Sequence, residues 1–174
     1  MRARKLFNAS RISRGSLALL VALLLITAAV SAQAATKLVI HVNKGFGAVK
    51  LGVTDTNAVK AIGKPSKSGK DSEYEGRVVY YKFYGKANKN GEYPLEIYSD
   101  TKHKVFMFAI NASAYPTDEG TKVGSTEAQL KAKYGKNLKF KAGRVYNHYW
   151  LGSKVGTDFF VKAGKVTQII VRSY

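Results

Sequence analysis

A segment that occurs twice is the feature that most constrains the fold of this chain. Residues 52–63 reappear 72 positions later as residues 124–135. Both copies open with glycine, carry threonine two positions later with an acid directly after it, and close on glycine after the same interval. Self-similarity at a long spacing indicates a repeated structural unit. The sequence therefore predicts a tandem duplication.

Each copy predicts the start of a short helix. Thr54 and Thr126 stand where an N-cap residue belongs, because their hydroxyls can accept a backbone N–H of the first turn. Asp55 and Glu127 follow at the first helical position, where a negative charge suits the positive end of the helix dipole. In the second copy Gln129 stands three positions after the threonine, which completes a capping box.

Each copy also predicts a packing face and a helix end. Apolar residues four positions apart share one side of a helix, Ala58 with Ile62 and Leu130 with Tyr134. The closing glycine then stops the helix, since glycine adopts a left-handed conformation without penalty. Helices of about two to three turns are not stable in isolation. We therefore expect each helix to pack against a sheet.

The first 34 residues predict a secretory signal peptide rather than part of the fold. A basic region precedes an uncharged apolar run over residues 17–30, and Ala32-Gln33-Ala34 offers a cleavage site. The run is shorter than the roughly 20 residues of a spanning helix, so a cleaved signal is favoured over an uncleaved anchor. No cysteine follows it, which excludes a lipoprotein anchor at this point. We expect a secreted or extracytoplasmic, cell-envelope protein.

The mature chain is expected to be strongly basic and free of disulfides. Five of the 29 lysines and arginines lie in the first 34 residues and none of the 11 acids do, which leaves a net charge of +13. The absence of cysteine excludes thiolate metal sites and cysteine nucleophiles. Such a protein must rely on its hydrophobic core, for which 11 tyrosines, 8 phenylalanines and 1 tryptophan supply aromatic side chains.

Strand patterns follow each predicted helix. Residues 64–76 are predicted as a polar loop, and Ala163-Gly164 as a tight hairpin turn. The predicted strands are 37–42, 77–84, 95–100 and 104–110, then 138–141, 144–151, 158–162 and 165–171. We expect an α+β fold of two tandem repeats, each a short helix packed on an antiparallel β-sheet of about three to four strands. The repeats would span residues 35–110 and 111–174, with the core of the second at 115–174.

The caps, turns and helix stops of both halves form a family pattern. It consists of Gly52-x-Thr54-Asp55 with Gly63-Lys64-Pro65, and of Tyr115-x-Thr117-x-x-Gly120-x-x-Val123-Gly124-Ser125-Thr126 with Tyr134-Gly135. On these residues the chain resembles the β-lactamase-inhibitor-protein-like (BLIP-like) superfamily, which also includes small outer-membrane-assembly lipoprotein domains. The resemblance covers nearly all of the mature chain. It implies a helix on one face of an antiparallel sheet, with tandem copies forming a concave surface that binds other proteins.

The chain departs from that superfamily in two respects. Without cysteine it has neither the inhibitor's disulfides nor a lipid anchor. In the inhibitors an aspartate–tyrosine pair on a hairpin of the first half enters the target's active site. The nearest counterpart here is Glu92-Tyr93, in the loop 85–94, with a different acid. The alternative for this pair is an exposed hairpin tip.

Strand alternation divides the candidate binding residues between two faces of the sheet. In the strand 77–84 we assign Val79, Tyr81 and Phe83 to the helix-facing core. Large aromatic side chains with polar tips carry much of the binding energy at protein interfaces, although they also stack across strands to cover a sheet. The residues predicted for the open, partner-binding face are Tyr80, Lys82, Tyr84, Tyr98, Tyr146, His148 and Trp150.

No arrangement of residues predicts catalysis. The three histidines, His41, His103 and His148, are scattered and lack acids at paired spacing, so no metal site is expected. Gly-x-Ser-x-Gly is absent, and the glycines at 45 and 47 lack the rest of a phosphate-binding fingerprint. We therefore expect a protein that is not an enzyme and that has no cofactor.

The basic charge bears on the partner rather than on the fold. Arginine, the usual reader of base edges, is nearly absent from the mature chain, which disfavours nucleic acid. The leading expectation is a non-catalytic exported module that binds another extracytoplasmic protein through its open aromatic face. The alternatives are a basic cell-envelope protein that binds anionic wall polymer or a lipid surface, and an inhibitor of β-lactamase or another secreted enzyme.

Overall fold

The two helices predicted from the duplicated segment form where the caps place them. The computed structural model describes residues 38–173, so the predicted signal peptide lies outside the described residues. Helix α2 spans Asp55–Ile62 and helix α3 spans Glu127–Tyr134. Within the described residues, no helix has the length and hydropathy to cross a membrane.

The predicted caps are confirmed at both helix starts. The hydroxyl of Thr54 accepts the N–H of Asn57 at 3.4 Å, and that of Thr126 accepts the N–H of Gln129 at 3.2 Å. The Gln129 side chain accepts the N–H of Thr126 in return at 2.9 Å, so the predicted capping box is present. Local hydrogen bonding therefore marks where each helix begins. Long-range bonds add to it, from the N–H of Asp55 to the carbonyl of His103 and from the N–H of Glu127 to the carbonyl of Gly164.

The predicted glycine stops are also confirmed. Gly63 and Gly135 both have positive φ, 107° and 50°, which strains any residue with a side chain. The N–H of each glycine still bonds back to its helix, to the carbonyl of Val59 in the first and of Lys131 in the second. Each helix consequently ends after eight residues.

The described chain also contains eleven strands, joined by loops and turns. They are β1 (Ile40–His41), β2 (Gly45–Phe46), β3 (Val49–Lys50), β4 (Lys67–Tyr74), β5 (Arg77–Tyr84), β6 (Leu95–Ser99), β7 (Val105–Ile110), β8 (Lys139–Lys141), β9 (Asn147–Gly152), β10 (Val155–Lys162) and β11 (Lys165–Ser173). A short 3₁₀ turn, η2 (Gly135–Asn137), follows α3. Alternation of helices with antiparallel strands confirms the α+β class.

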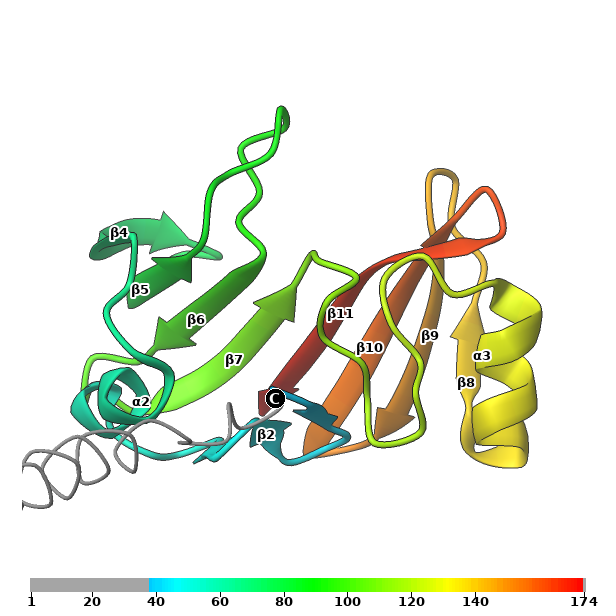
Figure 1. Ribbon diagram of the computed structural model, residues 1–174, viewed down its shortest axis with the longest axis horizontal. Helices are drawn as coiled ribbons and strands as arrows, with labels where there is room; N and C mark the ends of the chain where they lie inside the picture. Colours follow the sequence, from blue (N-terminus) through cyan, green and yellow to red (C-terminus); the bar gives the residue numbers. More distant parts are fainter. Residues whose placement is uncertain (1–37, 174) are drawn as a thin grey trace, which may run out of the picture. The chain divides into compact units, whose positions relative to one another are not determined.

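The expectation of two equal helix-plus-sheet repeats is wrong. Eight strands form one antiparallel sheet in the order β4-β5-β6-β7-β11-β10-β9-β8, and β1-β2-β3 form a separate small sheet (Figure 1). The halves join because β7 pairs with β11, from Ile110 opposite Ile169 to Met107 opposite Arg172. Without this pairing, β7 of the first half and β11 of the second half would each be an apolar edge strand with unpaired backbone groups. The result is one continuous sheet with a β1–β3 addition in the first half only.

Strand β4 corrects the prediction of a polar loop at residues 64–76. It pairs with β5 in antiparallel register, from Lys67 opposite Phe83 to Tyr74 opposite Arg77. Because β4 lies at the edge of the sheet, most of its side chains are exposed and polar. Polar edge strands protect a sheet from further pairing, and they lack the apolar alternation that marks inner strands.

Both helices and the small sheet cover the same face of the large sheet. Ala58 of α2, Leu130 of α3 and Phe46 of β2 are fully buried in one core, together with Tyr149 of β9 and Phe159 of β10. We call this the helix face. The opposite face, which carries neither α2 nor α3, is called the open face.

Candidate functional site

The side chains of β5 divide between the faces in the opposite way to the prediction. Lys82 contacts Asp55 at the start of α2, and Tyr84 belongs to the core beneath the helices. The ring of Tyr80 packs on His103, which also contacts Asp55. Tyr80, Lys82 and Tyr84 therefore lie on the helix face. The prediction failed because Lys82 has its carboxylate partner far away in the sequence.

The predicted residues of the second half do lie on the open face. Tyr149 and Leu151 of β9 are core residues, so His148 and Trp150 between them point the other way. The His148 ring stacks on Trp150 and on Phe160, with both centroid distances 5.0 Å. Tyr146, which is 43% exposed, contacts Phe160 edge-on. We call Tyr146, His148, Trp150 and Phe160 the second-half cluster.

A second group of rings lies on the open face of the first half. Phe83 is its centre and contacts Tyr81 at 4.6 Å, Tyr93 at 4.9 Å and Tyr98 at 5.8 Å between centroids. Tyr74 of β4 adds a ring 5.1 Å from that of Tyr98. Tyr98 was predicted for this face. We call these five residues the first-half cluster.

A carboxylate holds the rings of the first-half cluster in place. Glu96 of β6 accepts the hydroxyl of Tyr98 at 2.8 Å and the N–H of Tyr93 at 3.0 Å. Asn111 donates to the same carboxylate at 3.4 Å. Burial, together with the neighbouring charge of Glu96, raises the pKa of Tyr98 well above its usual value. The phenol therefore stays a proton donor to Glu96.

A buried carboxylate anchors the second-half cluster. Asp158 of β10 is completely buried, and one of its oxygens lies 2.6 Å from Nε2 of His148. Arg172 of β11 donates Nε–H to the other oxygen at 3.0 Å. Sequence reasoning missed this ion pair, although Asp158 was recognisable as a single acid directly before the apolar run Phe159-Phe160-Val161. Satisfied buried charges of this kind position the groups around them.

The acid at the start of α2 forms a cluster on the helix face. Asp55 contacts Nζ of Lys82 at 2.7 Å and Nδ1 of His103 at 3.0 Å, and it accepts the hydroxyl of Ser99. Burial by itself would raise the pKa of Asp55, but the hydrogen bonds from Lys82, Ser99 and His103 outweigh it and lower that pKa. Ser99 is 1% exposed, so its hydroxyl is covered by the surrounding side chains and serves as a hydrogen-bond donor to Asp55 within the fold.

The candidate plug residues Glu92 and Tyr93 lie in the hairpin that connects β5 to β6 and extends away from the sheet (Figure 1), but their side chains have different surroundings. Glu92 is exposed and accepts the side-chain amide of Asn88 at 2.8 Å. Tyr93 instead turns back and packs its ring on Phe83. Of the two, Glu92 is exposed, whereas Tyr93 is half-buried.

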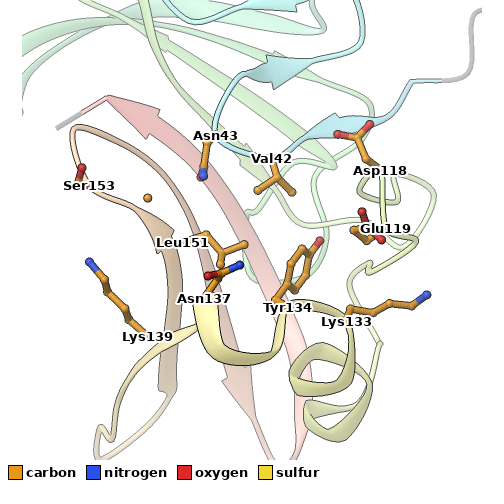
Figure 2. A pocket seen from close by; sticks show the side chains of 11 residues that line it. Val42, Asn43, Asp118, Glu119, Lys133, Tyr134, Asn137, Lys139, Leu151 and Ser153 are labelled. Carbon is orange, nitrogen blue, oxygen red and sulfur yellow. The ribbon is translucent and has the colours of Figure 1, made fainter.

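A pocket of about 700 Å³ lies away from every residue predicted to bind. Figure 2 shows its apolar floor of Val42, Tyr134 and Leu151, with Asp118 on one side and Lys139 on the other. Asp118 is already engaged by Nδ1 of His41 at 2.9 Å. The charged groups at the rim are exposed and of both signs, so they select no single ligand charge. Among residues 38–173, no three His, Cys, Asp or Glu side chains gather as a metal site would require.

Comparison with known proteins shows similarity at the level of the fold. No protein-family model and no curated protein matches the chain. The crystal structure of YfeY from Escherichia coli aligns with a TM-score of 0.52 at 18% identity, over 77% of this chain and 99% of that one. An extracellular SCP-domain protein from Bacillus anthracis aligns with a TM-score of 0.48 at 11% identity, over 71% of this chain and 44% of that one.

Proposed function

We propose that this protein is a non-catalytic, exported module that binds another extracytoplasmic protein through the open face of its sheet. The observation that carries the proposal is the gathering of two aromatic clusters on the face that α2 and α3 leave uncovered. Aromatic side chains with a polar tip contribute strongly to protein interfaces. Tyrosine and tryptophan in particular combine large contact area with few rotatable bonds.

The rings are ordered before any partner arrives, which favours binding. Glu96 fixes Tyr98, while Asp158 fixes His148, which in turn stacks between Trp150 and Phe160. Side chains that are already immobile lose little conformational entropy on association. Export is the part of the proposal that rests on residues 1–34, with their basic region, apolar run and small-residue cleavage site.

Capture with matched variants tests this function. Immobilised mature protein, residues 35–174, is incubated with envelope extract and culture medium, and retained proteins are identified after washes at low and high salt. We expect one protein to survive the high-salt wash and to be lost with the Tyr146→Ala/Trp150→Ala double variant. Tyr80→Ala is the control, because Tyr80 is an aromatic residue of the helix face. Capture that is equally strong with all variants contradicts the use of the open face.

The net charge of +13 on residues 35–174 supports a second candidate, a cell-envelope protein that binds anionic wall polymer or lipid. Attraction between exposed charges weakens as salt shortens the screening length to about 8 Å at physiological ionic strength and below that at higher salt. An aromatic interface should persist under the same wash. Retention of polymer or lipid alone, with complete release by salt, would favour this second candidate over a protein partner.

A further inference from the structure

The second-half cluster borders a small pocket on the open face. The pocket has a volume of about 280 Å³. Its walls come from the ends of β8, β9 and β11 and from the turn after β9, and consist of Lys139, His148, Trp150, Gly152, Ser153 and Arg172. Sites for drug-sized ligands usually measure about 300–1,000 Å³. This pocket lies at the lower end of that scale and has room for one side chain or one small anion.

The charge of the pocket wall is positive. Lys139 and Arg172 line it, and no acid does. Asp158 lies beneath, but it is completely buried and is engaged by both His148 and Arg172. Lys139 is exposed and, within the part of the chain that the structure describes, has no ion-pair partner. An anion that enters the pocket thus meets an uncompensated lysine.

The positions of these groups are determined by the sheet. Lys139 stands directly opposite Trp150 in the β8–β9 register, so their side chains share one face. Arg172 is held by its Nε–H bond to Asp158 at 3.0 Å, and the imidazole of His148 is held between two rings. A site whose side chains are locked by packing and by a supporting layer of hydrogen bonds binds with little reorganisation.

The indole of Trp150 adds an apolar wall to this cationic pocket. A free inorganic anion has no apolar surface to pack against the indole, whereas an acidic amino-acid side chain has methylene groups that can do so. Its carboxylate would then lie between Lys139 and Arg172. Charge-assisted hydrogen bonds between cationic side chains and a carboxylate are about twice as strong as neutral ones.

We propose that this pocket seats a single carboxylate from an acidic side chain of a protein partner. Lys139 and Arg172 supply the positive charge, and Trp150 packs against the methylene groups. That the occupant belongs to a protein rests on the proposed function; the pocket adds that this protein presents an acidic side chain. The net charge of +13 on residues 35–174 makes an acidic partner surface complementary to the mature chain as a whole.

Trp150 is the only tryptophan of the chain, so intrinsic fluorescence reports on this pocket directly. The mature protein is titrated at constant ionic strength with acetyl-Glu-Glu-Glu-amide and, in parallel, with acetyl-Gln-Gln-Gln-amide. We expect a saturable change in Trp150 emission with the glutamate peptide only. Lys139→Gln should raise the dissociation constant about tenfold, the effect of losing one charged hydrogen bond. Lys64→Gln, an exposed lysine of the first half, should leave it unchanged.

Several outcomes would overturn the assignment of this pocket as a carboxylate seat, meaning a site that binds one carboxylate of the partner. Trp150 emission could show no saturable change, or it could change equally with both peptides. Lys139→Gln and Lys64→Gln could also weaken binding of the glutamate peptide equally, which would indicate attraction by diffuse charge. A saturable response to phosphatidylglycerol vesicles without one to the glutamate peptide would assign the pocket to a lipid surface instead. Lys139 is exposed, so its substitution does not threaten folding, and circular dichroism checks this.

The capture experiment separates failure of the seat from failure of the proposed function. If Lys139→Gln protein retains the captured partner as strongly as the unchanged chain, the seat is wrong and the binding function stands. If the glutamate peptide binds with the expected Lys139 dependence but no protein is captured, the seat stands and the proposed function is wrong.

Discussion

The acid that begins each helix is buried in the first half and partly exposed in the second. Asp55 is only 7% exposed and is contacted by Lys82 from β5, Ser99 from β6 and His103 from the β6–β7 turn. It therefore ties α2 to three separate segments of the chain. Glu127 has a more modest environment, with Lys131 of its own helix at 2.7 Å and the hydroxyl of Tyr149.

Strand register explains the difference between the two acids. Lys82 stands opposite Ile97 in the first half, as Tyr149 stands opposite Phe159 in the second. Lys82 and Tyr149 lie on the second strand after the helix of their own half, β5 and β9, and each contacts the acid that begins that helix, so we treat their positions as corresponding. The same local rule places an acid at both helix starts. The strand residue that faces the acid then decides its interaction: Lys82 forms a buried ion pair with Asp55, whereas Tyr149 donates a hydrogen bond to a partly exposed Glu127.

The largest difference between the halves should appear when each acid loses its charge. Asp55→Asn leaves the Lys82 ammonium nearly buried without its counter-charge, since this side chain is 15% exposed. Breaking a buried ion pair from one side costs about 3 kcal/mol or more. We expect a fall of about 3 kcal/mol in the free energy of unfolding, measured by urea denaturation. Equal losses for Asp55→Asn and Glu127→Gln would contradict the comparison.

Lowering the pH should remove the contribution of Asp55 to the free energy of unfolding. The pKa of Asp55 in the folded protein lies below its ordinary value of 3.8, because hydrogen bonds from Lys82, Ser99 and His103 outweigh the effect of burial. Ionised Asp55 therefore stabilises the fold above about pH 4, and this stabilisation is lost as the pH falls through the lowered pKa. The gap in unfolding free energy between the unchanged chain and Asp55→Asn should be constant at neutral pH and narrow below pH 4. A constant gap down to pH 2 would contradict this.

Replacing Tyr84 with phenylalanine should raise the free energy of unfolding, in contrast to the loss expected for Asp55→Asn. Its hydroxyl is buried and finds no hydrogen-bond partner among the described residues, while burial and then the charge of Asp55 raise its pKa to about 12. Leu151, with no polar atom in its side chain, comes two residues after Tyr149 on β9, as Tyr84 comes two residues after Lys82 on β5. Tyr84→Phe should thus raise the free energy of unfolding by about 1 kcal/mol, the cost of an unsatisfied buried group. A loss of similar size would reveal a hydrogen bond at this hydroxyl.

The features predicted correctly from the sequence are those that depend on nearby residues. Thr54, Thr126 and Gln129 cap their helices through bonds that span three positions. The faces of β9 were also predicted correctly, because Leu151 made the core side of that strand apolar. Short-range hydrogen bonding and local alternation suffice for such features.

The features missed depend on partners distant in the sequence. The side of β5 that faces the helices is chosen by the Asp55–Lys82 ion pair, and no pattern within residues 77–84 indicates it. The Asp158–Arg172 pair and the joining of β7 to β11 likewise link segments that are separate in the chain. Such pairings are determined by tertiary packing, which overrides local preference.

Glu127→Gln should produce the smallest change in the free energy of unfolding. Comparing its salt dependence with that of Asp55→Asn distinguishes a partly exposed charge from a buried one. The hydrogen bond from Lys131, followed by that from Tyr149, lowers the pKa of Glu127. A partly exposed acid in the first helical turn is worth about 0.3–1 kcal/mol at low salt. We expect a loss within this range by urea denaturation at low salt and a smaller one in 1 M sodium chloride. The loss from Asp55→Asn should be nearly independent of salt, because buried pairs are little screened. A salt-independent loss for Glu127→Gln would instead mean that the bond to Tyr149, rather than the charge, is what the second half uses.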